Sequence, residues 1–325
     1  MNKYRFLKYS EEMIDAWDSF VSNAKNSTFL FQRAYMDYHS DRFDDASIMI
    51  YHNQKLLALL PANVKDRKLF SHQGLTYGGL VYAKEVKFRV VLEVFKELMI
   101  YLSKSDVETL QISLLPQFYS NYGNDEIDYM LHLCKSTLVK KKAFSVLNLS
   151  NNNMFSTNRL EGYKRGNKHE LKLRYDDEIE SFWRKILIPN LKDKYKSKPV
   201  HSIEEILLLK SRFPNNIIQV NIYNNNKLVA GTTLFVTNNV VRAQYISGNS
   251  DNNVIGCLDF LFYKLIKEYF DDKIYFDFGS SASGNLGNIN QNLQYWKEGF
   301  GARTFVQNIY EVKTDNYKLL NNSLE

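Results

Sequence analysis

The stretch IMIYHNQKLLALLPA, residues 48–62, recurs further along the chain as VNIYNNNKLVAGTTL, residues 220–234. In each copy two apolar runs flank a polar tip, which predicts a β-hairpin. Upstream of each hairpin, YSEEMIDAWDSFV at residues 9–21 and YDDEIESFWRKIL at residues 175–187 also match, and both predict a helix. A chain that repeats a helix followed by a hairpin is expected to contain one supersecondary unit twice.

Both copies then continue with the same order of elements, namely a long amphipathic helix, a short strand, a second helix and a last strand. The segments are 86–102, 108–115, 125–137 and 143–149 in the first copy, and 257–270, 273–279, 289–298 and 304–312 in the second. The predicted fold class is therefore α/β (α+β), with halves at residues 1–150 and 151–325. Each half is expected to carry a mixed, mostly antiparallel twisted sheet flanked by helices.

Three aromatic pairs are expected to occupy equivalent positions in the two halves. They are Tyr9 with Tyr175, Trp17 with Trp183, and Tyr51 with Tyr223. Both tryptophans are expected to be largely buried, because each is the largest apolar residue of its predicted helix. The polar and basic stretch 150–174 is expected to join the halves.

Composition and charge narrow the classes of function. The 325 residues are 44% hydrophobic and 14% aromatic, which is enough for two cores. The 42 basic and 36 acidic side chains give a net charge of +6, which suits phosphate-bearing ligands but falls short of a dedicated nucleic-acid binder. Cys134 and Cys257 stand alone, so no disulfide framework and no metal site are expected. No long uncharged apolar run or signal sequence is present, so a cytoplasmic protein without a membrane span is expected.

Six short strings carry a resemblance to a known family. They are TFLFQRAYMDYH from Thr28, YKRGNKHEL from Tyr163, PVHSIEEI from Pro199, QYISG from Gln244, YFDFGSS from Tyr275 and YWKEGFGAR from Tyr295. Together they resemble the FemAB-like branch of the GNAT superfamily, and the likeness covers nearly the whole chain. Its most specific elements are Asp277-Phe278-Gly279 and, a short interval later, Lys297-Glu298-Gly299-Phe300-Gly301.

The resemblance implies two tandem GNAT-like halves and an acyltransferase activity. The FemAB-like branch includes the Fem aminoacyltransferases of peptidoglycan cross-bridges and acyltransferases of surface-polysaccharide clusters. It implies transfer of an acyl or aminoacyl group to an amine on an amino sugar or on a cell-wall or polysaccharide precursor. That acceptor would be a small molecule or would be linked to a lipid or nucleotide. The alternative is a catalytically silent module of a polysaccharide cluster that binds a carbohydrate or a nucleotide sugar.

The donor is expected to be acyl-CoA, with aminoacyl-tRNA as the alternative. Ordinary GNAT enzymes hold the pyrophosphate of acetyl-CoA on a Q/R-x-x-G-x-G/A loop and a helix N-terminus. The corresponding stretch here, Ser247 to Gly256, has glycines at both ends but lacks that spacing, and Thr76 to Gly79 in the first half matches no better. The C-terminal half is expected to bind the donor, at a split between strands that end at Ser247 and Asp277. A tRNA partner is expected only as donor.

Three residues are catalytic candidates. His201 precedes Ser202 and Glu205, which form a capping-box pattern, and a neutral imidazole there can accept a proton from an attacking amine. Glu298, at the end of the last helix, is suited to orienting or deprotonating the acceptor, and Asp277 is suited to binding substrate hydroxyls or amines. The alternatives are a packed residue at a helix start for His201, a solvated helix-end charge for Glu298 and a cap of the loop after Asp277.

Further residues are candidates for substrate binding. Lys297 is expected to neutralise a phosphate or a developing oxyanion, with a helix-dipole role as the alternative. The resemblance places Arg165 and Lys168 in a basic stretch that helps to hold a nucleotide-linked or lipid-linked acceptor, and a solvated linker is the alternative. The remaining candidates are polar residues expected on matching third strands of the two meanders, where they line the acceptor cleft or satisfy strand ends: Tyr245, Ser247, His72 and Tyr77.

Overall fold

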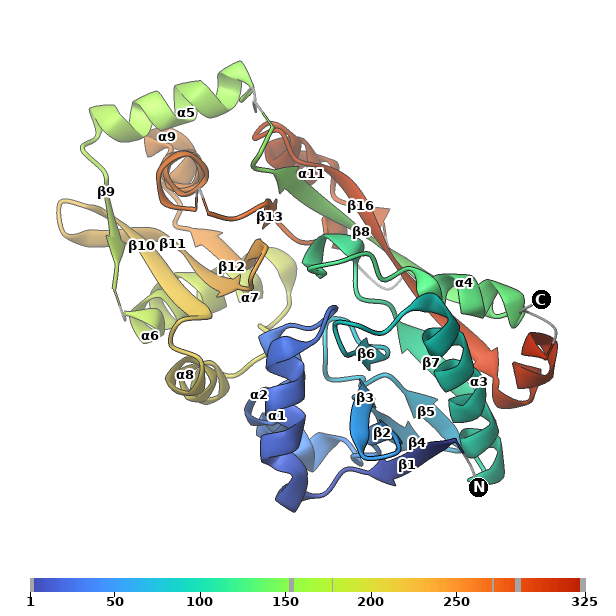
Figure 1. Ribbon diagram of the computed structural model, residues 1–325. Coiled ribbons are helices and arrows are strands. Elements are labelled where there is room, and N and C mark those ends of the chain that lie inside the picture. Colours follow the sequence, from blue (N-terminus) through green and yellow to red (C-terminus); the bar gives the residue numbers. More distant parts are fainter. Residues whose placement is uncertain (1–2, 152–154, 177, 271, 284–287, 322–325) are drawn as a thin grey trace. The chain divides into compact units, whose positions relative to one another are not determined.

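The computed structural model describes residues 3–151, 155–176, 178–270, 272–283 and 288–321 (Figure 1). The chain forms two compact units. Unit 1 contains residues 1–142 and 306–325, and unit 2 contains residues 143–305. This division differs from 1–150 and 151–325 in one main respect, because the end of the chain belongs to unit 1. The physical reason is that Ile309 to Lys313 pair antiparallel with the strand that begins at Thr109.

Unit 1 contains two sheets with helices packed on them. The strands are β1 (Tyr4–Lys8), β2 (Ile48–His52), β3 (Lys55–Leu60), β4 (Asn63–Lys65), β5 (Lys68–Phe70), β6 (Val81–Tyr82), β7 (Thr109–Ser113) and the start of β8 (Thr137–Asn148). The helices are α1 (Ile14–Asn23), α2 (Arg33–Met36), α3 (Phe88–Lys104) and α4 (Glu126–Leu133), with 3-10 turns at Glu11–Met13, Phe29–Phe31, Asp37–Arg42, Gln117–Tyr119 and Thr314–Leu320. One sheet has the order β1-β2-β3-β6. In the other, β4, β5, β7 and the end of β16 are neighbours in that order.

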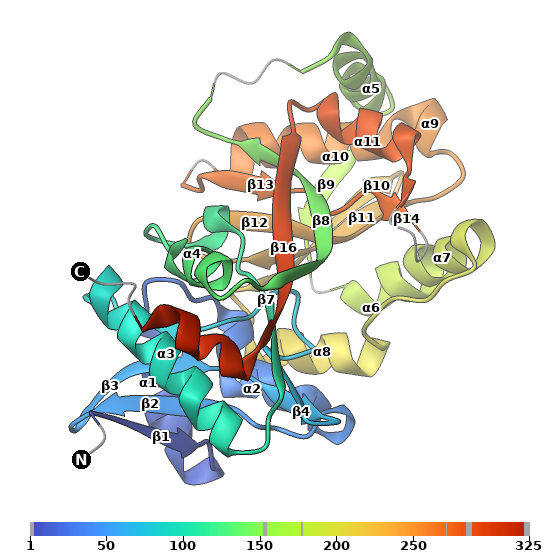
Figure 2. The same cartoon turned by 90° about the vertical axis from the view of Figure 1, so that its right-hand side faces the viewer.

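Unit 2 is built on one mixed sheet, in which β8, β13, β12, β11, β10 and β9 are neighbours in that order. The strands are β9 (Lys172–Tyr175), β10 (Ile217–Asn224), β11 (Lys227–Val236), β12 (Val240–Gly248), β13 (Tyr275–Asp277), β14 (Ala282–Ser283), β15 (Asn288–Ile289) and β16 (Arg303–Lys313). The helices are α5 (Thr157–Lys168), α6 (Ile179–Phe182), α7 (Ile188–Tyr195), α8 (Ile203–Arg212), α9 (Asn252–Ile255), α10 (Cys257–Lys264) and α11 (Gln291–Glu298), with π-helical turns at Trp183–Leu187 and Leu265–Tyr269. Helices α5, α9, α10 and α11 cover one face of this sheet, and α6, α7 and α8 lie on the other (Figure 2).

The hairpins confirm the internal repeat at the level of strand register. Ile48 pairs with Leu60 in β2 and β3, and Val220 pairs with Thr232 in β10 and β11, as the sequence match requires. Both hairpins carry a β-bulge at the same place, directly before Tyr51 in one copy and before Tyr223 in the other. A shared bulge is a strong sign of a common structural origin, since each bulge inserts one unpaired residue.

The tryptophan pair is buried as expected, with Trp17 and Trp183 both 0% exposed. The Nε1 atom of Trp17 donates to the Phe31 carbonyl at 2.7 Å, and that of Trp183 donates to Thr233 Oγ1 at 3.1 Å. Each indole thus buries a large apolar surface and still satisfies its polar atom. The pair Tyr9 and Tyr175 is displaced by one position, because the Tyr9 amide bonds to Ser47 while Tyr175 pairs with Val220.

Several elements were not predicted from the sequence. A strand, β1 or β9, directly precedes the first predicted helix of each copy, and the stretch expected to link the halves forms α5 and β9. His72 and Tyr77 do not lie on a strand. They belong to a turn region before β6, where His72 takes a left-handed backbone conformation with φ of 63°. The strand prediction was wrong there because it relied on alignment with β12, whereas β6 is only two residues long.

Candidate functional site

The candidate site of unit 2 lies where two parallel strands part. β12 and β13 pair through Val240 with Tyr275, Val241 with Phe276, and Arg242 with Asp277. β13 ends at Asp277, whereas β12 continues beside β11 as far as Gly248. The sheet therefore splits after Arg242 and Asp277, in agreement with the split that the sequence predicted between these strands.

An ion pair closes the base of the split. Arg242 Nη1 lies 2.6 Å from Asp277 Oδ2, and the Asp277 side chain is 0% exposed. The other carboxylate oxygen, Oδ1, accepts a hydrogen bond of 2.7 Å from the Gly279 amide. Gly279 has φ of +71°, a conformation that glycine adopts without strain. Both oxygens of Asp277 are thus engaged, one of them with the turn after β13, and its role in catalysis or substrate binding stays a prediction.

Lys297 is buried next to the same turn. Its side chain is 2% exposed, and its Nζ donates to the Gly279 carbonyl at 3.1 Å and to the Ser280 carbonyl at 2.8 Å. Burial lowers the pKa of Lys297 to about 8; the positive charge of Arg242 acts in the same direction, and the negative charge of Asp277 opposes it. An ammonium has three N–H donors, so these two carbonyls leave one donor for a further acceptor.

His201 is held against β12 by Tyr245. The two side chains hydrogen-bond through His201 Nδ1 and the Tyr245 hydroxyl at 2.6 Å, and both are buried. The Trp183 ring meets the Tyr245 ring edge-on at 4.7 Å. A β-bulge in β12 at Gln244 sets the direction of Tyr245, because Ala243 pairs with Leu234 and Tyr245 pairs with the preceding Thr233.

His201 and the ion pair lie on one face of the sheet. Tyr245 is opposite Thr233 and Arg242 is opposite Phe235, and alternate residues of a strand point to the same face. The His201 ring lies 6.2 Å from the Phe235 ring. His201 therefore lies on the same face of the sheet as Arg242 and Asp277, and Lys297 lies beside the turn that follows Asp277. Sequence reasoning missed Arg242, although an arginine inside the apolar strand VVRAQYISG signals a buried partner charge.

Ser202 is the N-cap residue of helix α8, which follows His201. Its hydroxyl accepts from the Glu205 amide at 3.1 Å, and the Glu205 carboxylate accepts from the Ser202 amide at 2.8 Å, so the predicted capping box is present. We expect Ser202→Ala to lower the free energy of unfolding by about 1 kcal/mol, because the Glu205 amide in the first turn loses its partner. Urea denaturation measures this effect. Ser211→Ala, at the exposed far end of α8, is the matched control, and an equal loss there would contradict the capping role.

Glu298 points differently from its neighbour Lys297. Successive residues of a helix are rotated by about 100°, and here Lys297 is buried while Glu298 is exposed. The Glu298 carboxylate accepts a 2.7 Å hydrogen bond from Gln294 of the same helix. Gln294 in turn accepts from Ser145 of β8 at 3.0 Å. These contacts match the solvated helix-end interpretation of Glu298, and its catalytic role stays a prediction.

The basic stretch with Arg165 and Lys168 forms α5, which packs on α10. A Cβ atom on Gly162 would come within 1.8 Å of Asp259, and one on Gly166 within 2.6 Å of Phe260, so both glycines allow close helix contact. Burial raises the pKa of Asp259, and the nearby guanidinium of Arg165 acts against that rise. The ion pair of Asp259 with α5 is formed by Arg159, at 2.5 Å, and substrate binding by Arg165 stays a prediction. Lys168 is exposed in the last turn of α5.

In the loop that corresponds to the CoA pyrophosphate loop of GNAT enzymes, most backbone amides are hydrogen-bonded within the protein. Within Asn249 to Leu258, hydrogen bonds inside the protein take up the amides of Asn249, Asp251, Asn252, Val254, Ile255, Gly256 and Leu258. Ser247 accepts a 2.8 Å hydrogen bond from Asn190 of α7. A phosphate cradle needs amides that are available to the ligand. Seven of the ten amides of this loop are therefore engaged inside the protein, and a CoA pyrophosphate at this loop stays a prediction.

His72 and Tyr77 are buried in unit 1. The His72 ring stacks on His39 at 5.2 Å, and burial lowers the pKa of His72 to about 4. Tyr77 donates a 3.0 Å hydrogen bond to Thr28 Oγ1.

Two further properties concern the whole described chain. In these residues no helix is long and apolar enough to cross a membrane, and no group of three or more His, Cys, Asp or Glu side chains is placed to hold a metal ion.

The fold matches solved structures across nearly their full length. The crystal structure of FemX has a TM-score of 0.66 at 9% identity, over 98% of this chain and 99% of that chain. The C-terminal domain of a putative lysylphosphatidylglycerol synthetase from Agrobacterium fabrum has a TM-score of 0.57 at 10% identity, over 96% of this chain and 95% of that chain. L-PGS from Bacillus licheniformis has a TM-score of 0.57 at 11% identity, over 96% and 94%.

Sequence comparison adds no further relative. No protein-family profile matches the sequence, and no curated protein matches it. At identities of 9–11% the likeness establishes a shared fold alone, because one fold can host unrelated functions. The chain therefore has the fold of FemX, in agreement with the predicted FemAB-like fold.

Proposed function

We propose that the chain is an acyltransferase that moves an acyl or aminoacyl group from an activated ester or thioester to an amine. The observation that carries this proposal is the buried Lys297 at the split between β12 and β13, with one N–H donor beyond its two carbonyl partners. A positive donor held in a water-poor site is suited to stabilising the oxyanion of acyl transfer. The FemX-like fold supports the same class of reaction by analogy.

In the proposed reaction the amine nitrogen attacks the carbonyl carbon of the donor. The new C–N bond forms while the carbonyl oxygen takes up negative charge, which the Lys297 ammonium stabilises. Collapse of the tetrahedral intermediate then breaks the C–O or C–S bond, and the leaving alkoxide or thiolate takes up a proton. The proton lost by the attacking nitrogen passes to His201 through the Tyr245 hydroxyl, which is 2.6 Å from His201 Nδ1.

The donor and acceptor classes also belong to this proposal. Because seven of the ten amides of the 249–258 loop are already bonded, we favour an aminoacyl ester on tRNA over acyl-CoA as donor. We propose an amino sugar or another cell-wall precursor as acceptor, in free or nucleotide-linked form, and a cytoplasmic reaction. The alternative is a silent binding module. Its supporting observation is that Asp277 has both oxygens engaged and is therefore not a free base.

A donor panel tests the proposed function. The purified chain is incubated with acetyl-CoA or with aminoacylated tRNA, each with and without amino sugars and UDP-linked amino sugars. Release of free thiol, or transfer of a labelled amino acid to the sugar, measures the reaction. We expect amine-dependent transfer from the aminoacyl ester. Saturable sugar binding without transfer from either donor would instead establish the silent binding module.

A further inference from the structure

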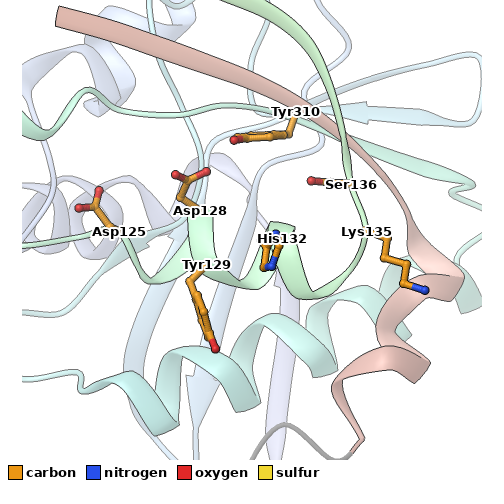
Figure 3. A pocket seen from close by; sticks show the side chains of 7 residues that line it. All are labelled: Asp125, Asp128, Tyr129, His132, Lys135, Ser136 and Tyr310. Atoms are coloured by element: carbon orange, nitrogen blue, oxygen red, sulfur yellow. The ribbon is translucent and has the colours of Figure 1, made fainter.

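Polar side chains gather in two further places. In unit 1, Asp128 and Tyr310 lie in a hollow beside α4 (Figure 3), which is open to water because Tyr129 on its wall is 52% exposed. In unit 2, a row of polar side chains is buried in the sheet beside Tyr245. Water solvates the first group, whereas every member of the second must find its partners inside the protein.

The buried row crosses three neighbouring strands of unit 2. Gln219 of β10 lies opposite Thr233 of β11, and Thr233 lies opposite Tyr245 of β12. Residues that lie opposite each other in an antiparallel pair stand side by side on one face of the sheet. Gln219 is 2% exposed and Thr233 is 0% exposed, so neither can turn to water for a hydrogen bond.

The row belongs to one continuous chain of hydrogen bonds. Trp183 Nε1 donates to Thr233 Oγ1 at 3.1 Å, and Thr233 Oγ1 donates to Gln219 Oε1 at 2.8 Å. Gln219 Nε2 donates to Asn221 Oδ1 at 2.8 Å, and Asn221 Nδ2 donates to Asp176 Oδ1 at 2.6 Å. An indole nitrogen only donates and an ionised carboxylate only accepts, so the two ends fix the direction of every bond between them.

The tryptophan end of this chain supports the pair of Tyr245 and His201. The Trp183 ring meets the Tyr245 ring edge-on at 4.7 Å, and the Tyr245 hydroxyl lies 2.6 Å from His201 Nδ1. Any rotation of the buried indole would break its bond to Thr233 and press on the Tyr245 ring, because protein interiors are close-packed. The orientation of Tyr245, and with it the hydrogen bond to His201, therefore depends on the chain.

The first copy of the repeat shows that the fold does not need this chain to bury its tryptophan. Trp17 of unit 1 is also 0% exposed, but its Nε1 donates to a backbone carbonyl. In the matched hairpin of unit 1, Pro61 takes the place of Thr233, and Met49 takes that of Asn221. Because side chains without hydrogen-bonding groups serve at these places in unit 1, the polar chain of unit 2 indicates a role beyond packing.

We propose that Thr233 and Gln219 are positioning residues, which keep His201 in place for the proposed acyl transfer. The hydrogen-bonded chain holds Trp183 in one orientation, and Trp183 supports Tyr245 against His201. The Tyr245 hydroxyl is thereby kept at His201 Nδ1, where the proton of the attacking amine is taken up. The expected effect on rate rests on the proposed function, whereas the effect on His201 is measured without substrate.

Heteronuclear NMR of the histidine rings in the full chain tests the proposal, and His201→Gln identifies the signals of His201. Thr233→Val keeps the shape of the side chain but removes the hydroxyl. We expect it to change both the Nδ1 chemical shift of His201 and the midpoint of its titration. Thr233→Ser restores the hydroxyl and should return both to their wild-type values. Gln219→Met leaves the Thr233 hydroxyl in place and should give a smaller change, which keeps the test valid if Thr233→Val folds poorly.

Thr237→Val is the matched control for a merely structural effect. Thr237 is a buried threonine of the same unit, and its hydroxyl makes two hydrogen bonds with the Val240 backbone in the turn between β11 and β12. Its loss should lower stability and leave the His201 signals unchanged. In the transfer assay, Thr233→Val should lower kcat about tenfold and leave KM nearly unchanged, because a misplaced proton acceptor slows the chemical step rather than binding.

Three results would overturn the positioning role. They are wild-type His201 signals in Thr233→Val, an equal change of these signals in Thr237→Val, and a wild-type kcat in a Thr233→Val variant whose His201 signals have changed. Absence of transfer by the wild-type chain from every donor would reject the proposed function instead. The NMR comparison would then still decide whether the chain of hydrogen bonds positions His201.

Discussion

Lys297→Met is expected to lower the rate of acyl transfer by about 10²–10³-fold, the range measured when one oxyanion donor is removed. Methionine matches the length and apolar stem of lysine but cannot donate to a developing oxyanion. Stability should change little, since the loss of two carbonyl hydrogen bonds is offset by removal of a charge that is 2% exposed. Single-turnover transfer from the donor identified by the panel, together with urea denaturation, measures both effects.

The pH dependence provides the control for this interpretation. With a pKa of about 8, Lys297 loses its proton as the pH rises through that value, so wild-type transfer should fall on the alkaline side. Asp277→Asn removes the charge that raises this pKa and should move the fall to lower pH. Lys297→Arg retains its charge at all these pH values and should flatten the profile. A Lys297→Met variant with wild-type rates, or a profile insensitive to Asp277→Asn, would remove Lys297 from the reaction.

Trp183→Ala is expected to lower the free energy of unfolding of unit 2 by about 3–5 kcal/mol, as large-to-small substitutions in cores do. The indole is 0% exposed, packs on Tyr245 and donates to Thr233 Oγ1, so its loss leaves a cavity and removes one of the two hydrogen bonds of the Thr233 hydroxyl. Urea denaturation followed by circular dichroism measures the change. Because the chain has two compact units, only the transition of unit 2 should shift.

An exposed aromatic residue of the same unit serves as the control for Trp183. Tyr295 on α11 is 61% exposed, and Tyr295→Ala should change stability by no more than about 0.5 kcal/mol. The same comparison applied to Trp17→Ala should move the transition of unit 1 by a similar 3–5 kcal/mol, since Trp17 occupies the equivalent place in the repeat. Equal and small effects for Trp183 and Tyr295 would show that the tryptophan is not a core anchor.

The sequence alone determined the features that depend on neighbouring residues. Alternation of apolar and polar residues around a polar tip predicted both hairpins, and the equivalent residues Ile48 and Val220 take the same place in their hairpins. The pattern Ser202 to Glu205 predicted a capping box that is present. These features are readable because strand periodicity, turns and helix caps are set within a few residues of chain.

Only the tertiary structure decided the roles of the candidate site residues. The sequence singled out Asp277 and Lys297, but it could not show that Arg242 pairs with the carboxylate or that two carbonyls hold the buried ammonium. It also could not show that the basic stretch forms α5, whose glycines Gly162 and Gly166 pack closely on Asp259 and Phe260 of α10. It also expected the last strand to belong wholly to the second half, whereas Ile309 to Lys313 pair with β7. Such partners are far apart in the chain, and strand pairing and helix packing select them, so no local pattern records them.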